Sequence, residues 1–317
     1  MAKRAFEKIM AGPADTISYA EGEESRDRIA NPIDAGWHRK YWDTMDQIYW
    51  SPNMIGLRAI AKSTWGDDPG KIVINRDQVK QGGSIYTRRH TASENRERMA
   101  GLEEPLNHIF DITFGIAECA VIARMFFQPF GIDDHGPFLR IGREIGQRYA
   151  DLGGNLTQQD ALFVSHRSII GVELKLGSST SPGQILKYLA LIVAEERLTG
   201  VRRDIGLLYI TPEEGIGKVA YHAGFMADGR LPEGYVRTVP AKQRNALVNR
   251  MLEARFGEFE DAAKRIRIQH KSWKDIASEA RVIGQEALSS PSGSETLARL
   301  MFGFSRAIEE HRGAIIA

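Results

Sequence analysis

Cysteine is nearly absent from this chain of 317 residues, in which Cys119 is the single thiol. One cysteine cannot form a disulfide within the chain, and a zinc site built from several thiolates is excluded. Because Ile116, Ala120 and Val121 around it are apolar, we expect Cys119 to be a small buried side chain of the core.

Long apolar runs are absent as well. No run in the sequence approaches the roughly 18 residues that a helix needs to cross a bilayer. The segment from Met1 to Glu7 is partly basic, but no apolar stretch follows it, so we expect no secretory signal peptide. The sequence therefore predicts a cytoplasmic protein with no membrane partner.

An excess of charge of one sign is missing too. The formal net charge is +1, which does not indicate a nucleic-acid binder, although the local potential of a groove matters more than the sum. The sequence also has no phosphate-binding loop, dinucleotide fingerprint or nucleophile elbow. With 42% hydrophobic and 26% charged residues, the composition is that of a globular protein with a sizeable core.

What the sequence does contain is a change of hydrophobic period. Apolar residues recur at helical spacing over 106–128, and Pro129 ends the pattern. The next part predicts a helix, two strands joined by a tight turn, a helix and a strand, at 138–150, 161–164, 169–176, 183–198 and 205–210. The last segment is continuously apolar, as is typical of a central strand buried on both faces. The fold class is therefore expected to be α/β.

The sequence divides into three regions. Residues 1–130 predict a mainly helical N-terminal region that packs on the core and is not a separate module. Residues 131–236 contain the α/β core. Residues 237–317 are predominantly helical and charged, and they end in a helix over 294–311 whose apolar stripe packs on the body or on a second subunit.

Two acidic residues are expected to meet across the central hairpin. If residues 165–168 form the turn, Val164 lies opposite Ile169, and counting outward places Asp160 opposite Glu173. Directly opposed residues have Cβ atoms about 5 Å apart, and like charges there destabilise the pair. A hard divalent cation between the carboxylates would remove the repulsion, and Mg²⁺ prefers oxygen ligands.

A lysine shares the face of one of these acids. Glu173 and Lys175 are two residues apart on one strand, whereas Val172, Leu174 and Leu176 point the other way, into the core. An ammonium group beside a two-carboxylate metal site can orient an attacking water or stabilise charge on a phosphate. The alternative is a plain ion pair on the wet face of a strand.

Together these residues resemble a known family. Asp160, followed by Glu173-Leu174-Lys175, resembles the paired motif of the PD-(D/E)XK nuclease superfamily. Downstream, Gln184 and Tyr188 resemble the Gln-x-x-x-Tyr motif of its RecB-like branch, and their spacing puts them on one helix face.

The resemblance covers residues 138–212 and has departures. Upstream, Glu144 lies where the family often places an extra acidic metal ligand. Gln159 stands where the motif's proline would precede the aspartate, and the Gly-x-x-x-His motif of the RecB-like branch is absent, since Gly142 is followed four residues later by Gly146.

The resemblance implies a fold and a reaction. The fold would be a nuclease-like mixed sheet flanked by helices, with helical N- and C-terminal additions. The activity would be metal-dependent hydrolysis of phosphodiester bonds in DNA, in defence, restriction or repair, with RNA as an open alternative substrate. Cutting two strands would suit a homodimer.

It also implies a role for each site residue. Asp160, Glu173 and Glu144, with a backbone carbonyl of Val172 or Leu174, would hold Mg²⁺ or Mn²⁺. Lys175 would position or activate the water. Gln184 and Tyr188 would contact the nucleic-acid backbone or support the lysine. The rival interpretation is a catalytically inactive nuclease-like protein that binds nucleic acid or another protein.

Other polar residues have simpler interpretations. Asp133, Asp134 and His135 precede Gly-Pro and predict a loop with a capping role. His166 falls in the hairpin turn and is expected to be solvated. His222 is expected on a later strand, from which it could face the site.

Overall fold

The structure is a computed structural model that describes residues 37–38, 103–141, 160–176, 180–213, 215–290, 294–311 and 314. At its centre is a five-stranded sheet in which the strands lie side by side in chain order. The strands are β1 (Leu139–Ile141), β2 (Ala161–Val164), β3 (Ser168–Leu174), β4 (Asp204–Thr211) and β5 (Arg267–Ser272).

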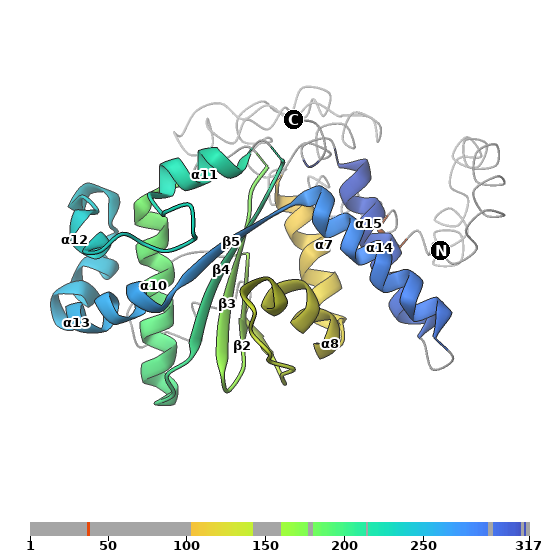
Figure 1. Ribbon diagram of the computed structural model, residues 1–317, viewed down its shortest axis with the longest axis horizontal. Coiled ribbons are helices and arrows are strands. Elements are labelled where there is room, and N and C mark those ends of the chain that lie inside the picture. Colours follow the sequence, from red (N-terminus) through yellow and green to blue (C-terminus); the bar gives the residue numbers. More distant parts are fainter. Residues whose placement is uncertain are drawn as a thin grey trace, which may run out of the picture.

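The sheet is mixed. β1, β2 and β3 form an antiparallel meander, and β4 and β5 continue it as parallel strands. Helices cover both of its faces (Figure 1). The expected α/β class, with a mixed sheet flanked by helices, is therefore confirmed.

One face of the sheet is covered by a long helix that follows β3 and by three helices later in the chain (Figure 1). These are α10 (Pro182–Thr199), α11 (Gly215–Ala223), α12 (Tyr235–Thr238) and α13 (Ala246–Arg265). Inward-facing side chains of β3 and β4, such as Ile169 and Leu207, are fully buried against α10. We call this the α10 face.

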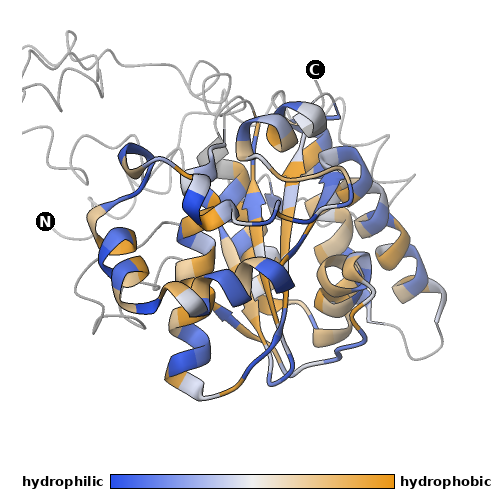
Figure 2. Cartoon of the chain, turned by 60° about the vertical axis from the view of Figure 1, so that its left-hand side comes forward, coloured by the Kyte–Doolittle hydropathy of each residue, from blue (hydrophilic) through white to orange (hydrophobic). Residues whose placement is uncertain are grey.

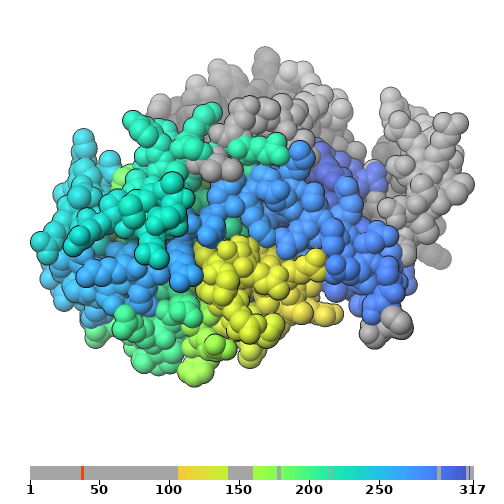
Figure 3. All heavy atoms as spheres, viewed as in Figure 1, coloured from red at the N-terminus to blue at the C-terminus, as the bar shows by residue number. Residues whose placement is uncertain are grey.

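The other face is covered by helices from both ends of the described chain, which pack on each other (Figures 1 and 3). They are α7 (Glu103–Ile116), α8 (Cys119–Ile122), a π turn (Ala123–Phe127), a 3₁₀ turn (Gln128–Phe130), α14 (Trp273–Ser289) and α15 (Glu295–Glu310). The ring of Phe304 on α15 lies 5.1 Å from Phe114 and 6.2 Å from Phe110 on α7, measured between centroids. Residues far apart in sequence thus form one hydrophobic layer, the α7 face.

Hydrophobic residues gather on the sides of the helices that meet the sheet, and polar residues line the outside (Figure 2). β4 is buried on both faces over Ile205–Thr211, as the continuous apolar run predicts. Within the described residues, no helix is both long enough and apolar enough to cross a membrane.

Helix α10 positions part of the candidate site, and its ends follow local rules. It begins at Pro182, because the fixed φ of proline suits the first helical turn. It ends at Gly200, whose φ of 68° is the left-handed value that glycine adopts at helix ends. A Cβ on Gly183 would lie 2.0 Å from the carbonyl oxygen of Gln243, so only glycine lets the 3₁₀ turn Ala241–Gln243 pack on this helix.

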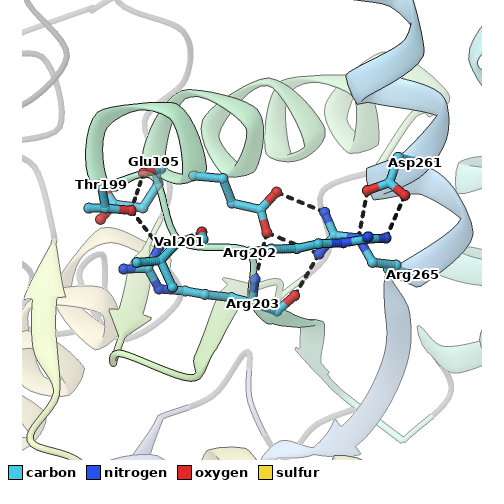
Figure 4. A network of polar contacts seen from close by, with 8 residues as sticks. Glu195, Thr199, Val201, Arg202, Arg203, Asp261 and Arg265 are labelled. Carbon is cyan, nitrogen blue, oxygen red and sulfur yellow. Dashed lines mark hydrogen bonds and ion pairs between the residues drawn. The ribbon is translucent and has the colours of Figure 1, made fainter.

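The amino ends of β3 and β4 hold a polar network between α10 and α13 (Figure 4). The Arg265 guanidinium donates to Glu196 Oε2 at 2.7 Å and to Asp261 Oδ2 at 2.8 Å. Arg203 donates through Nε to the carbonyl of Ser165 at 2.6 Å and through Nη1 to Thr199 Oγ1 at 2.8 Å. We call this group the hairpin-end network.

Two strands, β1 and β5, are not those expected from the sequence. Residues 139–141 were expected to begin a helix over 138–150, but they form β1, because Arg140 and its neighbours pair with β2; residues 142–150 lie outside the described residues. β5 lies in a region expected to be predominantly helical. Its sequence, Arg-Ile-Gln-His-Lys-Ser, is mostly polar because β5 is an edge strand of the sheet.

Other expectations have mixed outcomes. A later strand was considered for His222, from which it could face the site, but His222 lies on α11 and is exposed. Cys119 is half-buried and not fully buried. From the N-terminal region, the indole of Trp37 contacts the carbonyl of Leu300 at 3.4 Å, and His38 contacts Glu310 at 3.2 Å, so these two residues do pack on α15.

Candidate active site

The register of the central hairpin is the one that the turn predicts. Val164 pairs with Ile169, and Ala161, the first residue of β2, pairs with Val172. Continuing this register by one residue places Asp160 opposite Glu173. The carboxyl ends of β3 and β4 and the beginning of α10 lie at the same edge of the sheet (Figure 1).

The Asp160 carboxylate receives hydrogen bonds from two elements. Its Oδ2 accepts from the backbone N–H of Leu174 at the end of β3, at 2.7 Å. Its Oδ1 accepts from the side-chain amide of Asn107 on α7, at 2.8 Å. Asp160 directly precedes β2, and its carboxylate thus binds both to β3 and to α7.

Glu173 is the focus of the other motif residues. Its side chain lies on the α10 face, and the residue is only 3% exposed. Lys175 Nζ lies 2.6 Å from Oε1 in an ion pair, and the Tyr188 hydroxyl donates to Oε2. The side-chain amide of Gln184 donates to Oε1 at a long 3.5 Å. Three residues that the sequence singled out therefore meet around the carboxylate of a fourth, Glu173.

The tyrosines around this carboxylate remain protonated. Burial raises the pKa of the Tyr188 hydroxyl well above its ordinary value, and the negative charges of Glu173 and Asp160 raise it further. Burial and the charge of Glu173 also raise the pKa of Tyr209, whose hydroxyl lies 3.3 Å from Thr180 Oγ1. A hydroxyl that stays protonated remains a hydrogen-bond donor, which suits the contact of Tyr188 with Glu173.

The main chain at Lys175 forms hydrogen bonds with β4 and with the first residue of α14. Its N–H donates to the carbonyl of Ile210 at 2.8 Å, which extends the pairing with β4. Its carbonyl accepts from the indole N–H of the fully buried Trp273 at 2.9 Å. In a parallel ladder that carbonyl would accept from the residue at 212, which is Pro212 and has no N–H. The first residue of α14 takes over this role.

The residues at this edge fit a hard divalent cation. Asp160 and Glu173 supply carboxylate oxygens, and an ionised carboxylate oxygen can accept a hydrogen bond and still bind a cation, since each has two lone pairs. The carbonyl of Leu174 points to the same side of the strand as its N–H, which contacts Asp160. A donor set made of oxygen atoms suits Mg²⁺ and Mn²⁺.

Glu144, the expected third acid, lies outside the described residues. Within the described residues, no group of three or more His, Cys, Asp or Glu side chains gathers closely enough to hold a metal ion. The described oxygen ligands that a cation could use here are therefore the carboxylates of Asp160 and Glu173 and the backbone carbonyl of Leu174.

Two residues that contact the site, Asn107 and Trp273, were not predicted from the sequence. A signal for Asn107 existed, because it is a polar residue three and seven positions before Phe110 and Phe114, on the apolar face of its helix. No comparable signal marked Trp273, because an apolar residue at the start of a helix is ordinary.

The remaining polar candidates are structural or exposed. Asp134 is buried and accepts hydrogen bonds from the Ser165 hydroxyl and the Gly136 N–H, which fits the expected loop role. His135 and Asp133 form an exposed ion pair at 3.0 Å. His166 is exposed in the hairpin turn, as expected.

Similarity to known proteins does not identify this site. Any function assigned to it rests on its own geometry. Comparisons of the chain with protein-family models, with curated proteins and with solved structures gave no match.

Proposed function

We propose that this chain is a metal-dependent nuclease of the PD-(D/E)XK type, which hydrolyses phosphodiester bonds of DNA with Mg²⁺ or Mn²⁺. The observation that carries the proposal is the meeting of Lys175, Gln184 and Tyr188 on the Glu173 carboxylate. In register, the residue opposite that carboxylate is a second acid, Asp160.

The topology supports the same proposal. β2, β3, α10 and β4 follow one another as strand, strand, helix and strand, which is the order that the resemblance implies. The motif residues lie at the start of β2, at the end of β3 and in the first turns of α10, and these positions share one edge of the sheet (Figure 1).

Each residue then has a distinct role. Asp160 and Glu173 would hold the cation together with the Leu174 carbonyl. The bound ion would supply Lewis-acid stabilisation of the phosphate and a more acidic water. Lys175 would orient the attacking water and balance negative charge that develops on the phosphate. Tyr188 would fix the Glu173 carboxylate, since its raised pKa keeps it a hydrogen-bond donor.

The direct test is cleavage of nucleic acid by the purified full chain. Supercoiled plasmid, single-stranded DNA and RNA are incubated with Mg²⁺, with Mn²⁺ and with EDTA. We expect DNA cleavage that requires the metal and is lost in Lys175→Ala, while Lys264→Ala, a variant of an exposed lysine on α13, retains it. Equal background cleavage by the wild type and Lys175→Ala would contradict the proposal.

One observation favours a different class of function. Glu173 already accepts from Lys175, Tyr188 and Gln184, and a purely structural buried ion pair would have the same partners. The alternative is therefore a catalytically inactive protein that binds nucleic acid. It predicts DNA binding that is unaffected by EDTA and no cleavage under any of the conditions above.

A further inference from the structure

A side chain outside the resembling segment contacts the candidate site. Asn107 lies on α7, and its side-chain amide donates to Asp160 Oδ1 at 2.8 Å. Metal-binding side chains are commonly oriented by such outer hydrogen bonds. Asn107 is therefore placed to act on the cation site without belonging to it.

The helix that carries Asn107 is firmly packed. Phe110 and Phe114 are at most 1% exposed, and their ring centroids lie 4.6 Å apart. Phe114 also packs edge-on against Phe304 of α15, with an interplanar angle of 86°. The backbone that presents the amide is thus held by the hydrophobic layer of the α7 face.

The second polar atom of Asn107 is unsatisfied. Its Oδ1 is buried and receives no hydrogen bond within the described part of the chain. Leaving a buried acceptor unpaired costs about 1–3 kcal/mol. The side chain keeps this orientation in spite of the cost because its NH2 group donates to Asp160.

We propose that Asn107 is a positioning residue, which orients the Asp160 carboxylate for the divalent cation. The inference rests on the proposed function, because it needs a cation at Asp160 and Glu173. It extends that function to a residue that the resemblance does not cover, and it links metal affinity to the packing of α7 on α15.

The test is calorimetric titration of the full-length protein with MnCl₂, which requires no substrate. We expect Asn107→Ala to weaken Mn²⁺ binding by about 10- to 100-fold, as is typical when an outer partner of a metal ligand is lost. The matched control is Thr113→Val on the same helix. Thr113 is fully buried and its hydroxyl donates only within the helix, to Ile109, so its variant should bind Mn²⁺ like the wild type.

A second measurement separates positioning from a general loss of structure. The Mn²⁺ concentration for half-maximal cleavage should rise in Asn107→Ala by the same factor as the dissociation constant. The cleavage rate at saturating Mn²⁺ should stay within a few-fold of the wild type. Thermal melting of Asn107→Ala and Thr113→Val monitors folding; if Asn107→Ala unfolds, Asn107→Leu, which fills the same space, is judged by the same criteria.

The outcomes distinguish this inference from the proposed function. If the wild type binds Mn²⁺, Asp160→Asn does not, and Asn107→Ala binds as well as the wild type, Asn107 has no positioning role and the proposed function stands. If the wild type itself does not bind Mn²⁺, both proposals are wrong.

Discussion

The two ends of the β2–β3 hairpin carry polar clusters of opposite character. At the turn, the hairpin-end network joins Arg203 and Arg265 to backbone carbonyls and to acids on neighbouring helices (Figure 4). At the other end, Asp160 lies opposite Glu173 in the continued strand register, and Lys175 pairs with Glu173.

The balance of charge differs between the two clusters. In the hairpin-end network two carboxylates have arginine partners: Glu196 pairs with Arg265, and Asp261 pairs with both Arg265 and Arg202. Spare donors of Arg203 contact carbonyls, so the network is complete without a ligand. The site end places two acids opposite each other. The comparison teaches that the two acids of the structural cluster each pair with an arginine, whereas the candidate site places two acids opposite each other in the strand register.

The largest expected effect is on cleavage at the site end. Asp160→Asn should lower the cleavage rate by about 10³-fold, because it removes a charged metal ligand. The free energy of unfolding should fall by only about 1 kcal/mol, since the amide oxygen can still accept from the Leu174 N–H, although the new NH2 group can no longer accept from Asn107. Single-turnover cleavage and urea denaturation measure the two quantities. The control, Asp261→Asn in the hairpin-end network, should retain activity, and a similar loss of activity in it would break the comparison.

A substitution in the hairpin-end network should lower the stability and leave the cleavage rate unchanged. Arg265→Ala leaves Glu196 largely buried and without its cation, so we expect the free energy of unfolding to fall by about 3 kcal/mol. The cleavage rate per folded molecule should not change. The exposed pair of Arg197 and Glu258 provides the control, because Arg197→Ala should cost less than about 1 kcal/mol. A loss of cleavage in folded Arg265→Ala would contradict the division of roles.

The free energy of unfolding should depend on pH through His270 on β5. Burial lowers the pKa of His270 to about 4, and its Nε2 lies 2.6 Å from Thr211 Oγ1. The unfolded chain therefore binds a proton first as the pH falls. The stability contribution is complete above the ordinary pKa of about 6.5 and is lost between there and pH 4.

His270→Gln should remove this dependence. Relative to the variant, the wild type should lose about 2–3 kcal/mol of unfolding free energy between pH 7 and pH 4. The difference is measured by urea denaturation at each pH. His222→Gln, on the exposed face of α11, should leave the wild-type profile unchanged. If the unfolding free energies of the wild type and His270→Gln change equally with pH, this histidine is not held neutral in the folded protein.

The smallest effect is expected beside the turn, at Asp134. Burial alone would raise the pKa of Asp134, but hydrogen bonds from Ser165, Gly136 and Ser168, together with the charge of Arg167, lower it below its ordinary value. The stabilising contribution is therefore present above pH 4 and is lost as the pH falls through the lowered pKa.

Asp134→Asn should cost about 1 kcal/mol of unfolding free energy at pH 7 and nearly nothing at pH 2. Guanidinium denaturation at the two pH values measures the difference. Asp133→Asn, at an exposed position in the same loop, serves as the control. An equal cost at both pH values would mean that the Asp134 side chain stabilises the turn without its charge.

Part of the candidate site could be predicted because its geometry is local. A four-residue turn sets the register of a hairpin, and strand alternation then decides which side chains share a face, so Asp160, Glu173 and Lys175 could be related from sequence. Helical spacing did the same for Gln184 and Tyr188. Hydrophobic period located β2, β3, α10 and β4 within a few residues.

Other parts depend on contacts between distant segments. β1 is three residues long and β5 is a mostly polar edge strand, so neither has an alternation of apolar and polar residues from which a strand could be predicted. Both are strands because a neighbouring strand accepts and donates their hydrogen bonds.

The sequence by itself determined the hairpin register, the α/β class and the group of residues that meets at Glu173. Only the tertiary structure decided that α7 and α14 support this group, through Asn107 on Asp160 and Trp273 on the Lys175 carbonyl. The physical reason is the distance along the chain over which each effect acts. Turn geometry and residue period act over a few positions. These two hydrogen bonds join residues 53 and 98 positions apart, and they form only once the hydrophobic layers have packed.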